Sequence, residues 1–244
     1  MLYTEEMVRS NIRNREGKRV FFLGKSDTLT PGARDYLTRE RIAVLPGEQA
    51  KILQYRLLNG AVLREKPEQM THLNGDVLVE KTHPRIALRG AMDMLEAELL
   101  LCQLDCDGQL RQDMGQILAL ARLLVRCEVL DEPVPVQKLC GLTEQEQRMR
   151  SHHPQQYYGI PHFMPEAEDG QRILLLNRCR CAARAAELAA VRAFTDENGN
   201  TNRGDILRAL NRMSSMIYIL MLREKAAGKS GGPLHDREET GWKP

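Results

Sequence analysis

No segment says more about the fold of this chain than LLLNRCRCAARAAELAAVRAF, residues 174–194. Alanine and leucine dominate it, and because both are strong helix formers we expect a long helix here. Its polar side chains, Asn177, Arg180, Arg184 and Glu187, are separated by three, four and three residues. This spacing places all four on one face of the helix.

A second helix is expected over ILRALNRMSSMIYILMLR, residues 206–223, where Arg208, Asn211, Arg212 and Ser215 interrupt an otherwise apolar surface. Arginine presents a planar, permanently charged fork that matches phosphate oxygens, so two such faces near each other would form an anion site. The first interpretation is a site for the polyphosphate of a nucleotide. The alternative is that both stripes are solvated faces, and the pattern alone leaves both open.

The composition limits the class of protein. The chain has 244 residues, enough for one large domain or for a domain with an appendage. Its 35 Lys and Arg residues nearly balance 33 Asp and Glu residues, for a net charge of +2, so we expect no nucleic-acid partner. No apolar run approaches the roughly 20 residues of a membrane span, and the polar N-terminus lacks the pattern of a secretory signal. We therefore expect a cytoplasmic protein without membrane contact.

Six cysteines lie in apolar, helical surroundings, which in a cytoplasmic protein indicates reduced and mostly buried thiols. Cys179 and Cys181 are two residues apart on a predicted helix and therefore point to roughly opposite sides. Cys102 and Cys106 could share a face, but a zinc site needs further ligands that have no clear source here. We therefore predict neither a disulfide framework nor a metal site.

Residues 1–70 are turn-rich and mixed in character. We expect a short helix from Thr4 through Arg13, a strand in KRVFFLGK, a helix from Thr30 to about Glu40, a strand in RIAVLPG and then a linker. From residue 84 onward the apolar period is helical almost throughout. The first two of these helices are joined by a short turn at residues 105–108, which predicts an antiparallel pair.

A third helix begins with the capping box Thr143 and Glu146. It is followed by SHHPQQYYGIPHFMPEAEDGQ, a loop of about 20 residues, and loops of that length are often functional. Two long helices over residues 171–195 and 203–226 complete the pattern. The predicted class is thus mainly α: a bundle of about five helices over 71–227, preceded by a small mixed α/β appendage over 1–70 and followed by a disordered tail over 228–244.

With these segments laid out, the chain resembles the ATP:cob(I)alamin adenosyltransferases of the ethanolamine-utilisation type, which are related to the propanediol-utilisation type. The stretches that carry the resemblance are LTPGARDYL (29–37), MTHLNGDVLVEKTHPRIALRGAMDMLEAELLL (70–101), the HP…YYGIPHFMPEA loop (153–167), LLNRCRCAARAAELAA (175–190) and LRALNRMSSMIYILM (207–221). The resemblance covers most of the sequence, and together these stretches are more specific than any one stripe.

The resemblance implies roles around MgATP, which that family binds at the base of a helical bundle near a subunit boundary. Arg180, Arg184 and Glu187 match the family's Arg-x3-Arg-x2-Glu face, with the arginines on phosphate or in an inter-subunit salt bridge. Asn211 and Arg212 match the Leu-Asn-Arg-x-Ser motif that completes the nucleotide site.

Further roles in the first part of the chain follow from the same resemblance. Lys81 resembles the lysine that contacts the triphosphate ahead of the first bundle helix, and Asp93 resembles the aspartate that ion-pairs with one of the arginines. THLNGD, residues 71–76, loosely matches the Thr-Lys-Thr-Gly-Asp phosphate loop of the propanediol type, which implies ATP contacts from His72 and Asn74. The His-x11-Cys-Cys-x2-Cys metal motif of some ethanolamine-type members is missing, because no cysteine precedes residue 102.

The implied reaction transfers the 5′-deoxyadenosyl group of ATP to the cobalt of cob(I)alamin, giving adenosylcobalamin and triphosphate. Arg180 and Arg184 would be the catalytic groups, neutralising charge on the leaving triphosphate together with Mg²⁺. Cobalamin is the second substrate, and we expect Tyr158, His162 and Phe163 to lie against the corrin. The competing interpretation is that these aromatic residues only pin the loop to the core.

The resemblance also implies partners: an electron donor such as a flavoprotein reductase, and further copies of the chain in a dimer or trimer. It is compatible with a cytoplasmic location, with association to a bacterial microcompartment allowed. The alternative from a different class is a non-catalytic nucleotide- or cobalamin-binding scaffold bundle of such a microcompartment, which has kept the fold and lost turnover.

Overall fold

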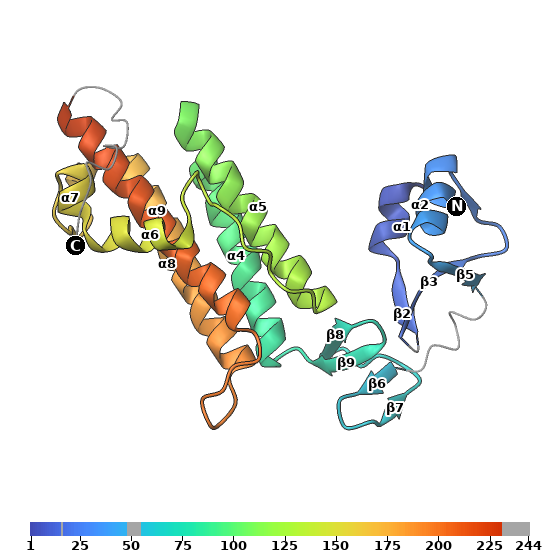
Figure 1. Ribbon diagram of the computed structural model, residues 1–244. Helices are drawn as coiled ribbons and strands as arrows, with labels where there is room; N and C mark the ends of the chain where they lie inside the picture. Colours follow the sequence, from blue (N-terminus) through green and yellow to red (C-terminus); the bar gives the residue numbers. More distant parts are fainter. Residues whose placement is uncertain (16, 48–54, 231–244) are drawn as a thin grey trace. The chain divides into compact units, whose positions relative to one another are not determined.

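The computed structural model describes residues 1–15, 17–47 and 55–230, and its contacts divide the chain into two compact units, Met1–His83 and Pro84–Pro244. Short strands dominate the first unit and helices the second, which confirms the predicted mainly α class with an α/β N-terminal part (Figure 1). The division falls later than the predicted boundary after residue 70, because residues 70–80 form a hairpin that pairs with another strand of the first unit. Most of the predicted tail, 228–244, lies outside the described residues.

The first unit contains small sheets and short helices. Its described elements are β1 (Leu2–Tyr3), α1 (Glu5–Ser10), β2 (Arg13–Arg15), β3 (Lys18–Leu23), β4 (Thr28–Leu29), α2 (Pro31–Arg39), β5 (Ala43–Pro46), β6 (Tyr55–Leu57), β7 (Val62–Leu63), β8 (Met70–Asn74) and β9 (Val77–Glu80). Strands β2, β3 and β5 form one sheet in that order, with β3 antiparallel to β2 and parallel to β5. A second sheet has the order β7-β6-β9-β8.

Capping side chains set the helix starts in this unit. The hydroxyls of Thr4 and Thr30 accept hydrogen bonds from the N–H groups of Met7 and Ala33, as the sequence predicts. The first helix is shorter than predicted, because α1 ends at Ser10 and the residues from position 13 onward pair with β3 instead. The stretch predicted as a linker contains β6 and β7 among its described residues.

The second unit is a helical bundle. Its described elements are α4 (Pro84–Leu104), α5 (Gly108–Leu130), α6 (Glu144–His152), α7 (Pro154–Tyr158), the 3₁₀ helix η1 (Ala167–Asp169), α8 (Gln171–Phe194) and α9 (Gly204–Ser230). Helix α4 packs against α5 and α8, α8 packs against α9, and the shorter α6 lies against α9 (Figure 1). The predicted short turn between α4 and α5 and the predicted capping box at the start of α6 are both confirmed.

Apolar faces of these helices meet in one core. Leu95 of α4, Ile117 of α5 and Leu210 of α9 are completely buried. Helix α8 contributes small side chains, and Ala183 and Ala186 are also completely buried. Small residues let neighbouring helix backbones approach closely, so the polar stripe of α8 is held firmly beside α9.

Buried ion pairs tie the helices together. Glu128 of α5 receives Arg85 at 2.5 Å and Arg89 at 2.7 Å, both from α4, and its side chain is 3% exposed. Asp113 of α5 pairs with Arg223 of α9 at 3.4 Å. Removing one partner of such a pair would leave a buried charge uncompensated, so these contacts fix the register of the bundle.

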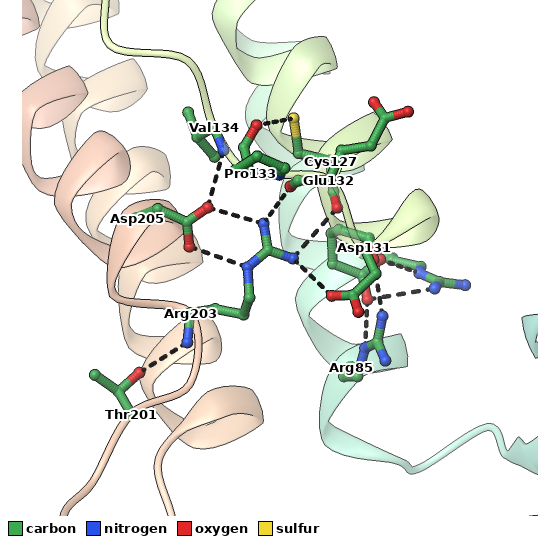
Figure 2. Close-up of polar contacts among 11 residues, drawn as sticks. Arg85, Cys127, Asp131, Glu132, Pro133, Val134, Thr201, Arg203 and Asp205 are labelled. Atoms are coloured by element: carbon green, nitrogen blue, oxygen red, sulfur yellow. Dashed lines mark hydrogen bonds and ion pairs between the residues drawn. The ribbon is translucent and has the colours of Figure 1, made fainter.

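Arg203 locks the start of α9 to the connection between α5 and α6 (Figure 2). Its guanidinium donates to the carbonyl oxygens of Glu132 at 2.8 Å and Cys127 at 3.3 Å, and it pairs with Asp205 at 3.0 Å. Asp205 also accepts the N–H of Val134 at 2.9 Å. The hydrogen bonds from Arg203 lower the pKa of Asp205 to about 2. These contacts are structural and hold the start of α9 against the end of α5 and the segment that follows it.

Candidate active site

Helices α8 and α9 and the segment after α7 surround a hollow of about 420 Å³, which we name the first hollow. Arg180 and Arg184 line it from α8, and His162 and Phe163 line it from the segment after α7. The rest of its wall is made by Ser151, His152, Met164, Pro165, Ser214, Ser215, Tyr218 and Met221. The structure thus brings both predicted catalytic arginines together with two of the three predicted corrin-binding residues.

Within the described part of the chain, neither arginine of the first hollow pairs with a carboxylate. Arg180 is half-buried and donates to Oδ1 of Asn177, at 3.1 Å from Nε and 2.9 Å from Nη2. Arg184 is exposed. By contrast, Arg178 on the same helix pairs with Glu98 at 2.7 Å. Two guanidinium groups without carboxylate partners can bind an anionic ligand without first breaking an ion pair.

Tyr218 of α9 organises an aromatic wall of the first hollow. Its hydroxyl lies 3.1 Å from Nδ1 of His162 and 3.4 Å from the backbone N–H of Phe163. Its ring stacks on both side chains, with centroid distances of 5.9 Å and 6.0 Å. The ammonium group of Lys225 lies over the phenyl ring of Phe163, 4.3 Å from its centroid. The stacked rings give the first hollow a flat surface, and two positive charges line the same hollow.

A second hollow, of about 620 Å³, lies among α6, α8 and α9. It is lined by Glu144, Gln145, Arg148, Glu187, Leu207, Arg208, Asn211 and Arg212. Nδ2 of Asn211 donates to Glu187 at 2.9 Å, and Arg212 donates to Oδ1 of the same Asn211. Burial and the neighbouring Arg148 lower the pKa of Arg212. The predicted ATP-binding residues of α8 and α9 are therefore divided between the two hollows.

Two of the predicted ATP-binding residues of the first unit contact neighbouring residues of the same unit. His72 of β8 lies with Nδ1 3.0 Å from the carbonyl oxygen of Gly75, and burial lowers its pKa. Lys81 pairs with Glu68 at 2.8 Å. Asn74 is exposed at the turn between β8 and β9. The ATP roles of His72, Asn74 and Lys81 stay predictions.

Two further candidates stand apart from the first hollow. Asp93 is exposed on α4 and makes no ion pair with the residues that the structure describes, so its salt bridge stays a prediction. Tyr158 is half-buried and packs against Ile160, Leu222 and Ala226. Its position matches the interpretation in which an aromatic side chain pins the segment to the core.

No group of three or more His, Cys, Asp or Glu side chains among the described residues is placed to hold a metal ion. Cys102 and Cys106 are buried beside each other, and the Cys106 thiol lies 3.1 Å from the carbonyl oxygen of Cys102. The hydrogen bond with Cys106 lowers the pKa of Cys102, but the hydrogen bond with Cys179 and burial outweigh it and raise this pKa to about 12. Both cysteines belong to the main hydrophobic core of the bundle.

Comparison with known proteins identifies the family of this chain. The sequence profile of the family described as cobalamin adenosyltransferase matches residues 61–224. The chain belongs to the cobalamin adenosyltransferase family. The match runs from β7 into α9 and includes every residue of both hollows.

Relatives of this adenosyltransferase carry a corresponding name. The "Corrinoid adenosyltransferase EutT" of Salmonella typhimurium is 34% identical over 158 residues, which is 65% of this chain and 59% of that relative. The protein of the same name from Escherichia coli strain K12 is 28% identical over 242 residues, covering 90% of each chain. These matches confirm the predicted family and the predicted class of enzyme.

Sequence reasoning missed several residues of this adenosyltransferase site, above all Tyr218 and Arg148. A signal for Tyr218 was present, because it follows Ser215 by three residues and so continues the polar stripe of α9. Arg148 lies on the separate helix α6, and no spacing along one helix can place it there.

Within the described residues, each helix is either too short or too polar to traverse a lipid bilayer.

Proposed function

We propose that this protein transfers the 5′-deoxyadenosyl group of ATP to the cobalt of cob(I)alamin, and that the transfer serves ethanolamine utilisation. The observation that carries the proposal is the first hollow, which Arg180 and Arg184 line together with Phe163 and Tyr218. The arrangement pairs a charged side suited to phosphate with a flat side suited to a corrin.

The reaction balances without proton transfer. Co(I) donates an electron pair to C5′ of the ribose, and a Co–C bond forms. The C5′–O bond breaks, and its electron pair leaves with the triphosphate. Cobalt passes formally from Co(I) to Co(III). Because the cobalt supplies the reactivity, the protein has to align the two substrates and neutralise charge on the leaving group.

Arg180 and Arg184 suit the second task. Their guanidinium groups carry a fixed charge and form no ion pair with carboxylates of the described residues. They can therefore stabilise the negative charge that develops on the oxygen that leaves C5′. The hydrogen bonds from Arg180 to Asn177 hold one of the two forks in a set orientation before substrate arrives. Such preorganisation lowers the cost of reaching the transition state.

Phe163 and His162 suit the first task. Both are fixed by Tyr218, and Phe163 presents an apolar ring to the hollow. An apolar ring against the lower face of the corrin would exclude the axial ligand of Co(II), which makes reduction to Co(I) easier. An electron donor such as a flavoprotein reductase would then supply the electron.

Mg²⁺ fits the donor set of the second hollow. The ion usually binds phosphate oxygens together with one or two carboxylates. Glu144 and Glu187 both line this hollow, beside the predicted phosphate-binding side chain Arg212. When bound with ATP, Mg²⁺ would neutralise part of the charge on the triphosphate.

We also infer a homo-oligomer, with dimer and trimer both open, located in the cytoplasm. Met94, Leu101 and Leu104 of α4 are 60%, 50% and 75% exposed, and Leu188 of α8 is 61% exposed. Large apolar side chains that are exposed on a helix surface can become buried in an interface between copies. Asp93 on the same α4 is free to reach an arginine of another copy. Sedimentation equilibrium of the wild type and of Leu188→Glu tests this, since the variant should dissociate.

The transfer itself is tested by an anaerobic spectroscopic assay with MgATP and chemically reduced cobalamin. Loss of the Co(I) spectrum together with appearance of adenosylcobalamin is the expected result. Binding of ATP without product would instead favour the alternative, a non-catalytic nucleotide- or cobalamin-binding bundle of a metabolic microcompartment.

A further inference from the structure

The second hollow carries positive charge that the residue roles above do not use. Arg148 of α6 and Arg208 of α9 line it together with Arg212. Arg148 and Arg208 are exposed, and neither pairs with a carboxylate among the residues that the structure describes. Other arginines of the bundle are paired with carboxylates: Arg85, Arg89, Arg122, Arg126, Arg172, Arg178, Arg203 and Arg223. Like Arg180 and Arg184 of the first hollow, Arg148 and Arg208 are therefore available to an anionic ligand.

The two hollows follow each other along the same pair of helices. On α8, Arg184 lines the first hollow, and Glu187, three residues later, lines the second. On α9, Ser215 lines the first hollow, and Arg212, three residues earlier, lines the second. Residues at this spacing are about one helical turn apart, or roughly 5 Å. An extended ligand can therefore occupy both.

The two hollows are lined by different residue types, which determines the orientation of an extended ligand. Aromatic side chains line the first hollow, which is where the corrin and the ribose C5′ have to meet if the proposed function holds. Arg148, Arg208 and Arg212 line the second hollow, and no aromatic residue is among the described residues of its wall. We propose that the second hollow binds the terminal phosphates of ATP, and the triphosphate after transfer, through Arg148 and Arg208 in addition to Arg212.

Electrostatics in the second hollow agree with an anionic occupant. Arg148 and Arg212 are close enough that the charge of one disfavours the charge of the other. A bound phosphate removes this repulsion by pairing with both. Glu144 and Glu187 face the same space and would repel bare triphosphate, so the magnesium complex should bind more tightly than the free anion.

The test is calorimetric titration of the full chain with inorganic triphosphate, with and without Mg²⁺. Arg148→Ala and Arg208→Ala should each weaken binding roughly tenfold, because each removes one charge-assisted contact. Arg111→Ala is the matched control, since Arg111 is exposed on α5 and lines neither hollow. Binding in this control should equal that of the wild type. In the transfer assay, the first two variants should raise KM for ATP with little change in kcat.

Unchanged triphosphate affinity in the folded double variant Arg148→Ala/Arg208→Ala would overturn the inference, as would failure of the wild type to bind triphosphate. If the double variant melts early, the single variants Arg148→Gln and Arg208→Gln, which keep an aliphatic stem, decide the question by the same titration. The identity of the ligand rests on the proposed function, but the anion site and the transfer reaction can be contradicted independently. A wild type that binds triphosphate and forms no adenosylcobalamin contradicts the proposed function and supports the anion site.

Discussion

The hydroxyl of Tyr218 lies 3.1 Å from Nδ1 of His162, while Nε2 of the same imidazole lies 3.2 Å from the carbonyl oxygen of His152. A carbonyl oxygen can only accept, so this network assigns the proton to Nε2 and makes Nδ1 the acceptor for the tyrosine hydroxyl. The hydroxyl oxygen in turn accepts the N–H of Phe163 at 3.4 Å. One side chain of α9 thereby fixes two successive residues of the aromatic wall.

Tyr218→Phe should loosen this wall without removing its stacking. Each lost hydrogen bond is worth about 1 kcal/mol, so we expect a several-fold lower rate of adenosyl transfer, with KM for ATP nearly unchanged. Tyr157→Phe is the control, because Tyr157 stacks with Arg150 and lines neither hollow. Steady-state assays at varied cobalamin and ATP separate the two parameters. Equal rates for wild type and Tyr218→Phe would remove the positioning role.

Phe163→Ala probes the assignment of the apolar ring to the corrin. Its phenyl ring stacks on Tyr218 and lines the first hollow. Without the ring, water or a ligand can reach cobalt, so transfer that starts from Co(II) should slow more than transfer that starts from chemically prepared Co(I). Phe163→Leu keeps apolar bulk and should fall between. Equal slowing of both reactions would show that Phe163 acts elsewhere.

Arg184→Ala should reduce transfer on the order of a hundredfold, the usual effect of removing one group that stabilises developing negative charge. The fold should survive, because Arg184 is exposed and has no carboxylate partner among the described residues. Arg178→Ala on the same helix is the matched control, since it loses only the contact with Glu98. Rates are compared at saturating ATP, with thermal melting as the check on folding. An unchanged rate would contradict the catalytic assignment.

The long helices were predictable because their signals are local. The composition and spacing within residues 174–194 determine both that α8 forms and which side chains share its polar face, and the structure keeps that face. The capping box of Thr143 and Glu146 likewise lies within one turn. In the first unit, the strand at Arg13 was missed because its partner lies across a hairpin, and pairing outweighed local helix propensity.

The division of the polar stripe into two hollows could not be predicted from spacing. It depends on α6, which packs against α9 and places Arg148 opposite Arg208 and Arg212. It also depends on the segment after α7, which bends at Gly159 and returns Phe163 to Tyr218. Such contacts join residues far apart in the chain, so a single sequence carries little information about them. Family resemblance supplied the candidate residues, and the three-dimensional arrangement shows which of them share a space.

Asp205 makes the stability of the bundle depend on acid. Its pKa in the folded protein is about 2, below the ordinary 3.8, because Arg203 donates to its carboxylate. A group whose pKa is lower in the folded protein than in the unfolded chain stabilises the fold at pH values above the unfolded-state pKa. This contribution is lost as the pH falls from about 4 through 2. With the side chain 30% exposed, we expect a loss of about 1–2 kcal/mol in the free energy of unfolding.

Denaturant titrations between pH 7 and pH 2.5 measure this contribution. Asp205→Asn keeps an acceptor for the N–H of Val134 but removes the charge, so the variant should be less stable than the wild type at pH 7 and the difference should shrink as the pH falls towards 2. Glu197→Gln is the control, because Glu197 is exposed and forms no ion pair with the described residues. A stability difference between Asp205→Asn and wild type that stays constant over this range would mean that the ion pair with Arg203 contributes nothing beyond its neutral hydrogen bonds.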